Sequence, residues 1–277
     1  MSYKRILTVQ DVSCFGQCSL TVALPIISAC GHETVILPSA VLSTHTAGFT
    51  GFTVRDLTDD IPGISAHWKK EGITFDAFYT GYLGSEKQID MILDIFKDNS
   101  REGALKIVDP AMADNGKLYP AFDSGYVNAM KKLCRNADIV LPNITEAAFL
   151  TDTKYREDYD EEHVKLLCER LISLGAKTVV MTGIGYTADT TGVAVYGKNG
   201  YEYFSHEKLA RSCHGTGDVF ASAFTGAVLS GLSPFEAAKV AAGFTLSSMK
   251  KTADDETHTY GVKFEKALPE LAALLNK

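Results

Sequence analysis

The sequence is poor in the features that mark membrane and nucleic-acid-binding proteins. No apolar run approaches the roughly 20 residues that span a bilayer. Lys4-Arg5 leads directly into the strand-like residues 6–9, so we expect no N-terminal signal and no membrane anchor. The 27 Lys and Arg against 34 Asp and Glu give a formal net charge of −7. This charge excludes a general nucleic-acid or anionic-membrane surface, although a local basic pocket for a nucleotide is compatible with it.

The cysteines are few and show no framework. None of the six forms a C-x-x-C pair, and their spacings match no common zinc site. They are spread over segments that read as buried. We therefore expect reduced thiols and a cytoplasmic protein.

Two familiar nucleotide motifs are also missing. There is no G-x-x-x-x-G-K-[ST] loop. Gly183-Ile184-Gly185 follows a strand, but turn and strand residues come after it rather than the helix that a dinucleotide fold requires. A dinucleotide-dependent oxidoreductase is therefore excluded.

Short apolar strands and helices alternate along the chain. We expect strands at 5–9, 33–37, 75–80, 105–108, 139–141 and 178–181, and a hairpin of 192–196 with 201–206. Helices are expected between and after the strands, among them residues 19–30 and 161–174. This alternation predicts an α/β fold, a mostly parallel sheet with helices on both faces, built as one domain over 1–277. The irregular residues 38–60 read as a flap over a site.

The sharpest chemical signal is the turn Gly215-Thr216-Gly217-Asp218, which opens a helix rich in small residues. Free backbone N–H groups and the helix dipole favour an anion there, and glycine lets a phosphate approach closely. Asp218 repels a phosphate, but it is well placed to take a proton from a hydroxyl that attacks one. Helix capping by Asp218 is the alternative, and spacing alone leaves both open.

Polar residues follow several of the expected parallel strands. Asp11, Gly81-Tyr82, Asp109-Pro110 and residues 143–146 all lie just past strand ends, where ligands bind in open parallel sheets. Asp109 and Glu146 could hold Mg²⁺ through waters. Their alternative role is helix capping and loop hydrogen bonding.

These residues resemble the motifs of the ribokinase-like kinases. Besides the turn ending at Asp218, Asp109-Pro110-Ala111-Met112 is similar to D-P-x-M, and residues 137–146 are similar to A-D-x-x-x-P-N-x-x-E. Residues 6–10, 42–46 and 80–85 resemble the pyridoxal kinase branch. The resemblance runs in order from about residue 4 to 260.

The resemblance implies a ribokinase-like three-layer α/β/α sandwich and a kinase that uses ATP and Mg²⁺, with a monovalent cation such as K⁺ as a further cofactor. The acceptor would be a B6 vitamer and the assembly a homodimer. Asp218 would be the base, and Gly215, Thr216 and Gly217 would face the transferred phosphoryl group. Six residues would bind the nucleotide: Asp109, Asn143, Glu146, Thr182, Gly183 and Phe244. Of these, Asp109 and Glu146 would also hold the metal ion.

The same resemblance implies an acceptor pocket. His45 and Tyr82 would hold the pyridine ring, and Thr44 and Asp11 would complete the polar contacts. Adenine would lie against the helix that carries Phe244 and Leu246, near the loop after His206. A cysteine at 213 resembles a subgroup in which a thiol captures the pyridoxal aldehyde, and a helix N-terminus would lower its pKa. An inert buried thiol is the alternative.

The sequence departs from the familiar pyridoxal kinases in places. Asp11 stands where many have serine, Ala113 replaces a glycine, and His214 reads as a turn residue. Residues 10–16 lack a sugar-kinase motif, so a sugar acceptor is not expected. Hydroxymethylpyrimidine, a similar flat ring, remains an alternative acceptor, and a non-catalytic vitamin-binding protein is a weaker one because the base and its glycines are present.

Overall fold

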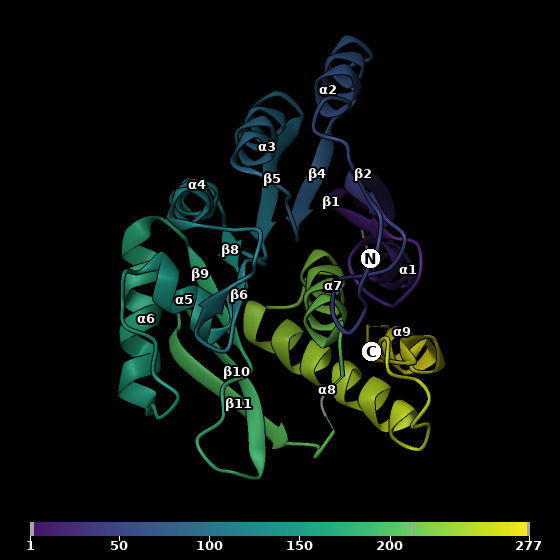
Figure 1. Ribbon diagram of the computed structural model, residues 1–277. Helices are drawn as coiled ribbons and strands as arrows, with labels where there is room; N and C mark the ends of the chain where they lie inside the picture. Colours follow the sequence, from purple (N-terminus) through teal and green to yellow (C-terminus); the bar gives the residue numbers. More distant parts are fainter. Residues whose placement is uncertain (1–2, 212, 276–277) are drawn as a thin grey trace.

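One nine-stranded sheet forms the centre of the computed structural model, which describes residues 3–211 and 213–275 (Figure 1). Its strand order is β11-β10-β9-β8-β5-β4-β1-β2-β3. The strands are β1 (Arg5–Ser13), β2 (Glu33–Leu42), β3 (Val54–Asp56), β4 (Phe75–Thr80), β5 (Ser100–Val108), β8 (Ile139–Val140), β9 (Thr178–Thr182), β10 (Thr190–Gly197) and β11 (Gly200–Glu207). The six central strands, β9-β8-β5-β4-β1-β2, pair in parallel. At the edges, β3 pairs antiparallel with β2, β10 with β9, and β11 with β10.

Helices cover both faces of the sheet (Figure 1). One face carries α2 (Ile61–Lys70), α3 (Glu86–Asp98), α4 (Ser124–Arg135), α5 (Ile144–Leu150) and α6 (Glu161–Leu174). The other face carries α1 (Leu20–Ala29), α7 (Thr216–Leu229), α8 (Pro234–Ala253), the short 3₁₀ helix η1 (Phe264–Lys266) and α9 (Leu268–Leu275). Each face buries its own apolar cluster, so the expected three-layer α/β/α architecture is confirmed. Among the described residues no helix is both long and apolar enough to cross a membrane.

Apolar spacing explains which side of each helix is buried. In α3, Ile89, Ile92 and Phe96 recur at helical intervals and are at most 3% exposed. The Ser85 hydroxyl accepts from the N–H of Gln88 and fixes where this helix begins.

The expected flap at residues 38–60 is partly wrong. β2 continues through Pro38 as far as Leu42, and β3 pairs with it antiparallel inside the segment that was read as irregular. Proline reads as a strand breaker, yet Pro38 stands opposite Gln10 in the register, just before a shift between Gln10 and Val12. Three further elements are not predicted by the sequence: the seven-residue α5, and the strands β6 (Ala113–Asp114) and β7 (Lys117–Leu118), which form a small hairpin.

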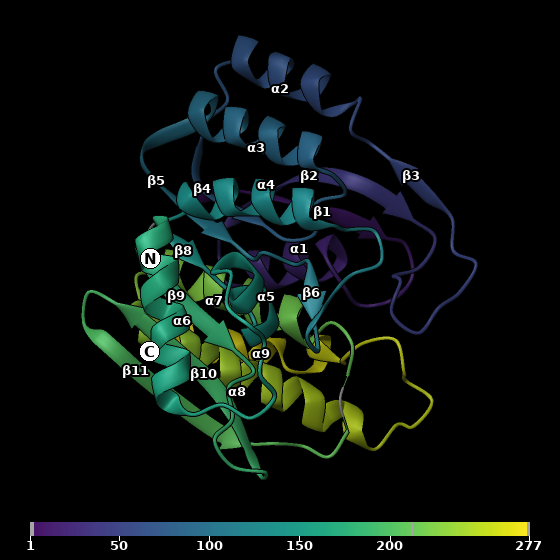
Figure 2. The ribbon, with the colours of Figure 1, turned by 60° about the vertical axis from the view of Figure 1, so that its left-hand side comes forward.

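The register brings the functional strand ends level with one another. Val9 pairs with Thr80, and Thr80 pairs with Val108, so the residues that follow these strands lie side by side. Beyond β8, Asn143 forms an isolated bridge with Thr182. Figure 2 shows that the segment between β2 and β3 and the segment after α8 project on the same side of the molecule. These two segments frame the edge where the strands end.

Candidate active site

The N-terminus of α7 has the geometry of an anion site. Gly215 caps the helix in the left-handed conformation (φ 74°), and a Cβ there would lie 2.0 Å from the carbonyl oxygen of Gln17. Only glycine fits that approach. A Cβ on Gly217 would meet nothing within 4 Å, so the space in front of the first turn is open. Free N–H groups of this turn therefore point to a region that an anion can occupy.

Asp218 lies in that turn and is held by the segment before α1. The backbone N–H of Ser19 and the thiol of Cys18 face its carboxylate. The pKa of Asp218 is raised to about 7: burial is the largest cause and the nearby charge of Asp11 adds to it, while the Ser19 N–H and the Cys18 thiol oppose it. A carboxyl group with a pKa near neutrality is suited to accept a proton.

Asp11 faces Asp218 from the end of β1. It is 5% exposed, and its oxygens accept from Ser19 Oγ (2.5 Å) and Ser13 Oγ (2.8 Å). Burial raises the pKa of Asp11, whereas these two hydrogen bonds and the charge of His45 lower it by a smaller amount. Ser19 has φ 54° and ψ −130°, a conformation that glycine adopts freely and that costs other residues about 1–3 kcal/mol.

His45 and Thr44 bring unpartnered polar atoms to the same region. His45 is 4% exposed, and its Nε2 lies 3.0 Å from the carbonyl oxygen of Tyr260. Within the described chain, His45 Nδ1 and Thr44 Oγ1 are buried and have no hydrogen-bond partner. A Cβ on Gly16 would lie 2.0 Å from the imidazole, so Gly16 makes room for it. Buried polar atoms are normally satisfied, so these two atoms are available to polar groups of a ligand.

Tyr82 lies at the carboxyl end of β4, half-buried. Its ring centroid lies 5.5 Å from that of Phe122, tilted by 32°. Burial raises the pKa of the Tyr82 hydroxyl, and the charges of Asp11 and Asp56 add to this. Asp11 thus acts electrostatically on both His45 and Tyr82, so the structure brings these three expected acceptor residues together.

Asp109 and Glu146 form a second acidic group next to Asp218. Burial raises the pKa of both well above the ordinary range; Asp218 raises that of Asp109 further, and Asp109 that of Glu146. Among the described residues, neither takes part in an ion pair. Two uncompensated carboxyl groups fit a divalent cation.

No group of three or more His, Cys, Asp or Glu side chains in the described part of the chain could hold a metal alone. A Mg²⁺ ion here would therefore share its remaining positions with water and phosphate oxygens, which is how this ion usually binds. Glu146 also has a structural role. Its oxygens accept from the N–H groups of Met112 (3.1 Å) and Asn143 (2.9 Å) and close a capping box at α5. Both roles that the sequence left open for Glu146 are compatible with this geometry.

Three nucleotide-side residues lie together at the ends of β8 and β9. Asn143 Nδ2 donates to the carbonyl oxygen of Ala113 (2.9 Å), and Asn143 bridges to Thr182. Gly183, next along the chain, has φ 70° and open space where a Cβ would stand. These three residues therefore lie side by side at the carboxyl end of the sheet.

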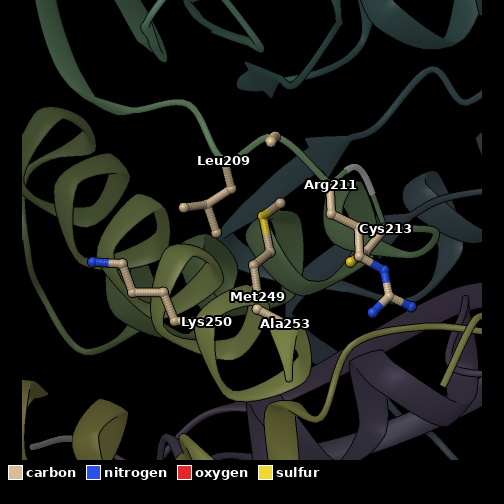
Figure 3. Close-up of a pocket in the computed structure, with 7 residues that line it drawn as sticks. Leu209, Arg211, Cys213, Met249, Lys250 and Ala253 are labelled. Atoms are coloured by element: carbon tan, nitrogen blue, oxygen red, sulfur yellow. The ribbon is translucent and has the colours of Figure 1, made fainter. Parts of the chain in front are cut away.

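A cavity of about 280 Å³ lies between the segment after β11 and α8 (Figure 3). It is lined by Leu209, Ala210, Arg211, Cys213, Met249, Lys250 and Ala253. Arg211 is fixed, because its guanidinium donates to the carbonyl oxygens of Asp255 (2.9 Å) and His258 (2.8 Å). The apolar walls suit a flat nucleobase.

The structure contradicts two expectations. Phe244 is 1% exposed and packs in the core beneath α8, so it cannot stack on adenine; Met249 and Ala253, on the outer side of the helix, line the cavity instead.

Burial raises the pKa of Cys213, although Arg211 opposes this, so the expected lowering is wrong. Cys213 lines the α8 cavity (Figure 3). His214 is an exposed turn residue whose ring lies 5.8 Å from that of His45.

Sequence reasoning missed Cys18, Ser19, Arg211 and Tyr260. Ser19 was read only as a helix start, and it is indeed the residue before α1. Tyr260 contributes a backbone carbonyl, which no side-chain pattern reveals. The family resemblance ends at about this residue. The contact between Tyr260 and His45 depends on the tertiary fold, so the sequence pattern gives no sign of it.

Comparison with known proteins gives the family. The phosphomethylpyrimidine kinase family matches residues 27–262. The chain belongs to this family. A Bacteroides thetaiotaomicron protein described as a phosphomethylpyrimidine kinase, crystallised with pyridoxal, is 38% identical with a TM-score of 0.92, over 98% of this chain and 96% of that one.

Two further relatives carry the pyridoxal kinase name. The Lactobacillus plantarum pyridoxal kinase structure is 32% identical with a TM-score of 0.92, over 99% of this chain and 98% of that one. The Dictyostelium discoideum pyridoxal kinase is 28% identical, over 80% of this chain and 77% of its own length. The expected ribokinase-like, pyridoxal kinase-like character is therefore confirmed, and the chain is a phosphotransferase of the vitamin-kinase type.

Proposed function

We propose that this kinase transfers the γ-phosphoryl group of ATP to the 5′-hydroxymethyl group of a B6 vitamer: pyridoxal, pyridoxine or pyridoxamine. One observation carries the choice of acceptor. His45 Nδ1 and Thr44 Oγ1 are unpartnered within the described residues, and Asp11 acts electrostatically on both His45 and Tyr82, which supports a flat ring with polar groups on its edge. The relative crystallised with pyridoxal at 38% identity supports the same choice.

Asp218 is the base in this proposal. Its carboxylate takes the proton of the acceptor hydroxyl while that oxygen forms a bond to the γ-phosphorus. The bond between this phosphorus and the oxygen bridging to the β-phosphate breaks, and ADP leaves with the electron pair. A pKa of about 7 lets Asp218 be deprotonated at neutral pH and still bind the proton as the hydroxyl attacks.

The first turn of α7 stabilises the charge that develops on the transferred group. The N–H groups of Gly215, Thr216 and Gly217 are fixed before the substrate arrives, so they need no reorganisation during the reaction. Asp109 and Glu146 would hold Mg²⁺, which supplies positive charge to the phosphate oxygens. Asn143 and Thr182, which pair with each other, and Gly183 would contact the phosphates, and the cavity between Arg211 and Met249 would take the base.

Hydroxymethylpyrimidine is the second candidate acceptor. The matched family carries the phosphomethylpyrimidine kinase name, and the Bacillus subtilis hydroxymethylpyrimidine/phosphomethylpyrimidine kinase is 26% identical over 89% of this chain. This ring also carries a hydroxymethyl group beside polar ring positions. Asp218 and the α7 turn would serve either acceptor in the same way.

The test measures ATP consumption with Mg²⁺ against pyridoxal, pyridoxine, pyridoxamine and hydroxymethylpyrimidine. Turnover of a B6 vitamer with a kcat/KM well above that of the pyrimidine is expected. Turnover of the pyrimidine alone would transfer the function to the second candidate. A lack of turnover with all four, together with tight vitamer binding, would favour a non-catalytic binding protein.

Further expectations from the resemblance stay predictions: one domain over 1–277, a monovalent cation such as K⁺, a homodimer and a cytoplasmic location. Size-exclusion chromatography with light scattering tests the dimer. Activity in K⁺ against tetramethylammonium at equal ionic strength tests the cation.

A further inference from the structure

Ser19 contacts both carboxylates of the acceptor side through different atoms. Its hydroxyl donates to Asp11 Oδ1 at 2.5 Å, and its backbone N–H lies close enough to the carboxylate of Asp218 to lower the pKa of that group. Ser19 is 6% exposed, so water does not readily replace either contact. The two aspartates come from β1 and α7, which are more than 200 residues apart in the sequence. One residue thus ties together the groups that would face the acceptor.

The conformation of Ser19 indicates that these contacts have a function beyond capping. Its side chain caps no N–H of α1, although it occupies the capping position. Its φ of 54° with ψ −130° is one that glycine adopts without penalty and serine does not. A residue that neither caps the helix nor suits its backbone conformation requires another reason, and strained residues cluster where geometry serves a site.

We propose that Ser19 is a positioning residue that fixes Asp218 and Asp11 relative to each other, so that the base meets the acceptor hydroxyl in a reactive geometry. This inference rests on the proposed phosphoryl transfer. The hydroxyl of Ser19 prevents rotation of the Asp11 side chain, and its N–H directs one oxygen of Asp218. Since α7 also carries the anion-binding turn, the same contact relates the base to the phosphoryl group. Misplacement by about 1 Å can cost on the order of 100-fold in rate.

Three serine variants separate this role from a merely structural one. Ser19→Ala removes the hydroxyl and keeps the N–H. Ser19→Gly removes the hydroxyl and also relieves the backbone. Ser13→Ala removes the other hydroxyl on Asp11, at 2.8 Å, without touching Asp218. Ser28→Ala, on the outer side of α1 where the hydroxyl contacts Thr34, is the matched surface control.

For both Ser19 variants we expect kcat to fall about tenfold or more, with the KM for ATP within about twofold of the unmodified protein. Ser13→Ala should raise the acceptor KM and change kcat less. Ser19→Gly should unfold at a higher temperature than Ser19→Ala, because its backbone is relieved. A Ser19→Gly protein with kcat within twofold of the unmodified enzyme would overturn the proposal.

A second measurement needs no turnover. Carboxyl-carbon NMR of the intact protein labelled in aspartate follows the pKa of Asp11. The Ser19 hydroxyl lowers that pKa, so Ser19→Ala should raise it. If the unmodified protein and Ser28→Ala phosphorylate none of the four acceptors, the proposed function has failed, and this titration still decides whether Ser19 holds Asp11. An unchanged Asp11 pKa in Ser19→Ala would show that it does not.

Discussion

The imidazole of His45 donates from Nε2 to the carbonyl oxygen of Tyr260, 3.0 Å away and 215 residues later in the sequence. A carbonyl oxygen only accepts, so Nε2 carries the proton, and in neutral His45 the buried Nδ1 is an acceptor. Burial lowers the pKa of His45, and nearby His214 lowers it further, which favours this neutral form. The position of Tyr260 therefore sets which kind of group on a ligand His45 can bind.

His45→Ala should raise the acceptor KM by about tenfold or more and change kcat less, because a hydrogen bond to the ring is lost. In the unmodified enzyme, the acceptor KM should rise as the pH falls through the His45 pKa, which lies below the ordinary histidine value. Protonation places a proton on Nδ1 and turns the acceptor into a donor. Steady-state kinetics from pH 5 to 8 checks both effects, and a KM that stays constant over this range would remove His45 from the pocket.

Asp218→Asn should lower kcat by about 100- to 10,000-fold and leave ligand binding nearly intact, because the amide cannot accept the proton. The pH profile gives a separate check. Since Asp218 must be deprotonated and its pKa is about 7, kcat/KM should fall as the pH drops below about 7. Isothermal titration with ATP and acceptor establishes that the variant still binds. Ordinary turnover by Asp218→Asn would exclude the base role.

Glu146 can be tested with a pair of variants. Glu146→Gln keeps an oxygen that accepts from Asn143 or Met112 but removes the charge, so the Mg²⁺ concentration for half-maximal activity should rise about tenfold while folding is retained. Glu146→Ala also removes the capping box and should destabilise the protein by about 1–3 kcal/mol. Mg²⁺ titrations and urea unfolding measure the two effects. Equal Mg²⁺ dependence in Glu146→Gln and the unmodified enzyme would leave Glu146 with capping alone.

Arg211→Ala should raise the KM for ATP and also that for the acceptor. Arg211 lines the α8 cavity and holds the segment from Asp255 to His258, which precedes the Tyr260 carbonyl used by His45. The loss of these bonds should also cost about 1–3 kcal/mol of stability. Lys250→Ala is the control in the same cavity: it breaks an ion pair with Glu207 that is about half exposed and contributes about 0–1 kcal/mol. If only the KM for ATP changed in Arg211→Ala, the two sites would be independent.

The cysteines should react in an order set by exposure. Cys14 is exposed, whereas burial raises the pKa of Cys213 and of Cys18. Iodoacetamide at pH 7 should therefore modify Cys14 first and Cys213 more slowly, since only the thiolate reacts. Peptide mass spectrometry at several times gives the order. Rapid modification of Cys213 would restore the reactive thiol that the sequence suggested.

Regular periodicity accounts for what the sequence predicts well. The parallel strands and long helices are fixed by apolar spacing over many residues, and α6 begins and ends where it was expected. The strand-end acids could be grouped in advance because parallel strands present their carboxyl ends at one edge. Asp109, Glu146 and Asp218 do lie within electrostatic reach of one another.

The errors have local physical causes. α5 is too short for its periodicity to be seen, and its start at Asn143 reads equally well as a strand end. Phe244 was assigned to the wrong side of α8, because small residues at most positions leave the orientation of this helix undefined. Helix dipoles predict a low pKa for Cys213, but burial acts in the opposite direction, and burial depends on residues far away in the sequence.

The carbonyl of Tyr260 also accepts from the N–H of Gln17, so the segment before α1 and the segment after α8 are joined at the acceptor pocket. A ribosome releases residue 17 long before it adds residue 260. A nascent chain can form most of its sheet and still lack the partner that orients His45. The pocket proposed for the acceptor can therefore close only after residue 260 has been added, long after the strand that carries Asp11 and the strand that precedes Tyr82 have been made.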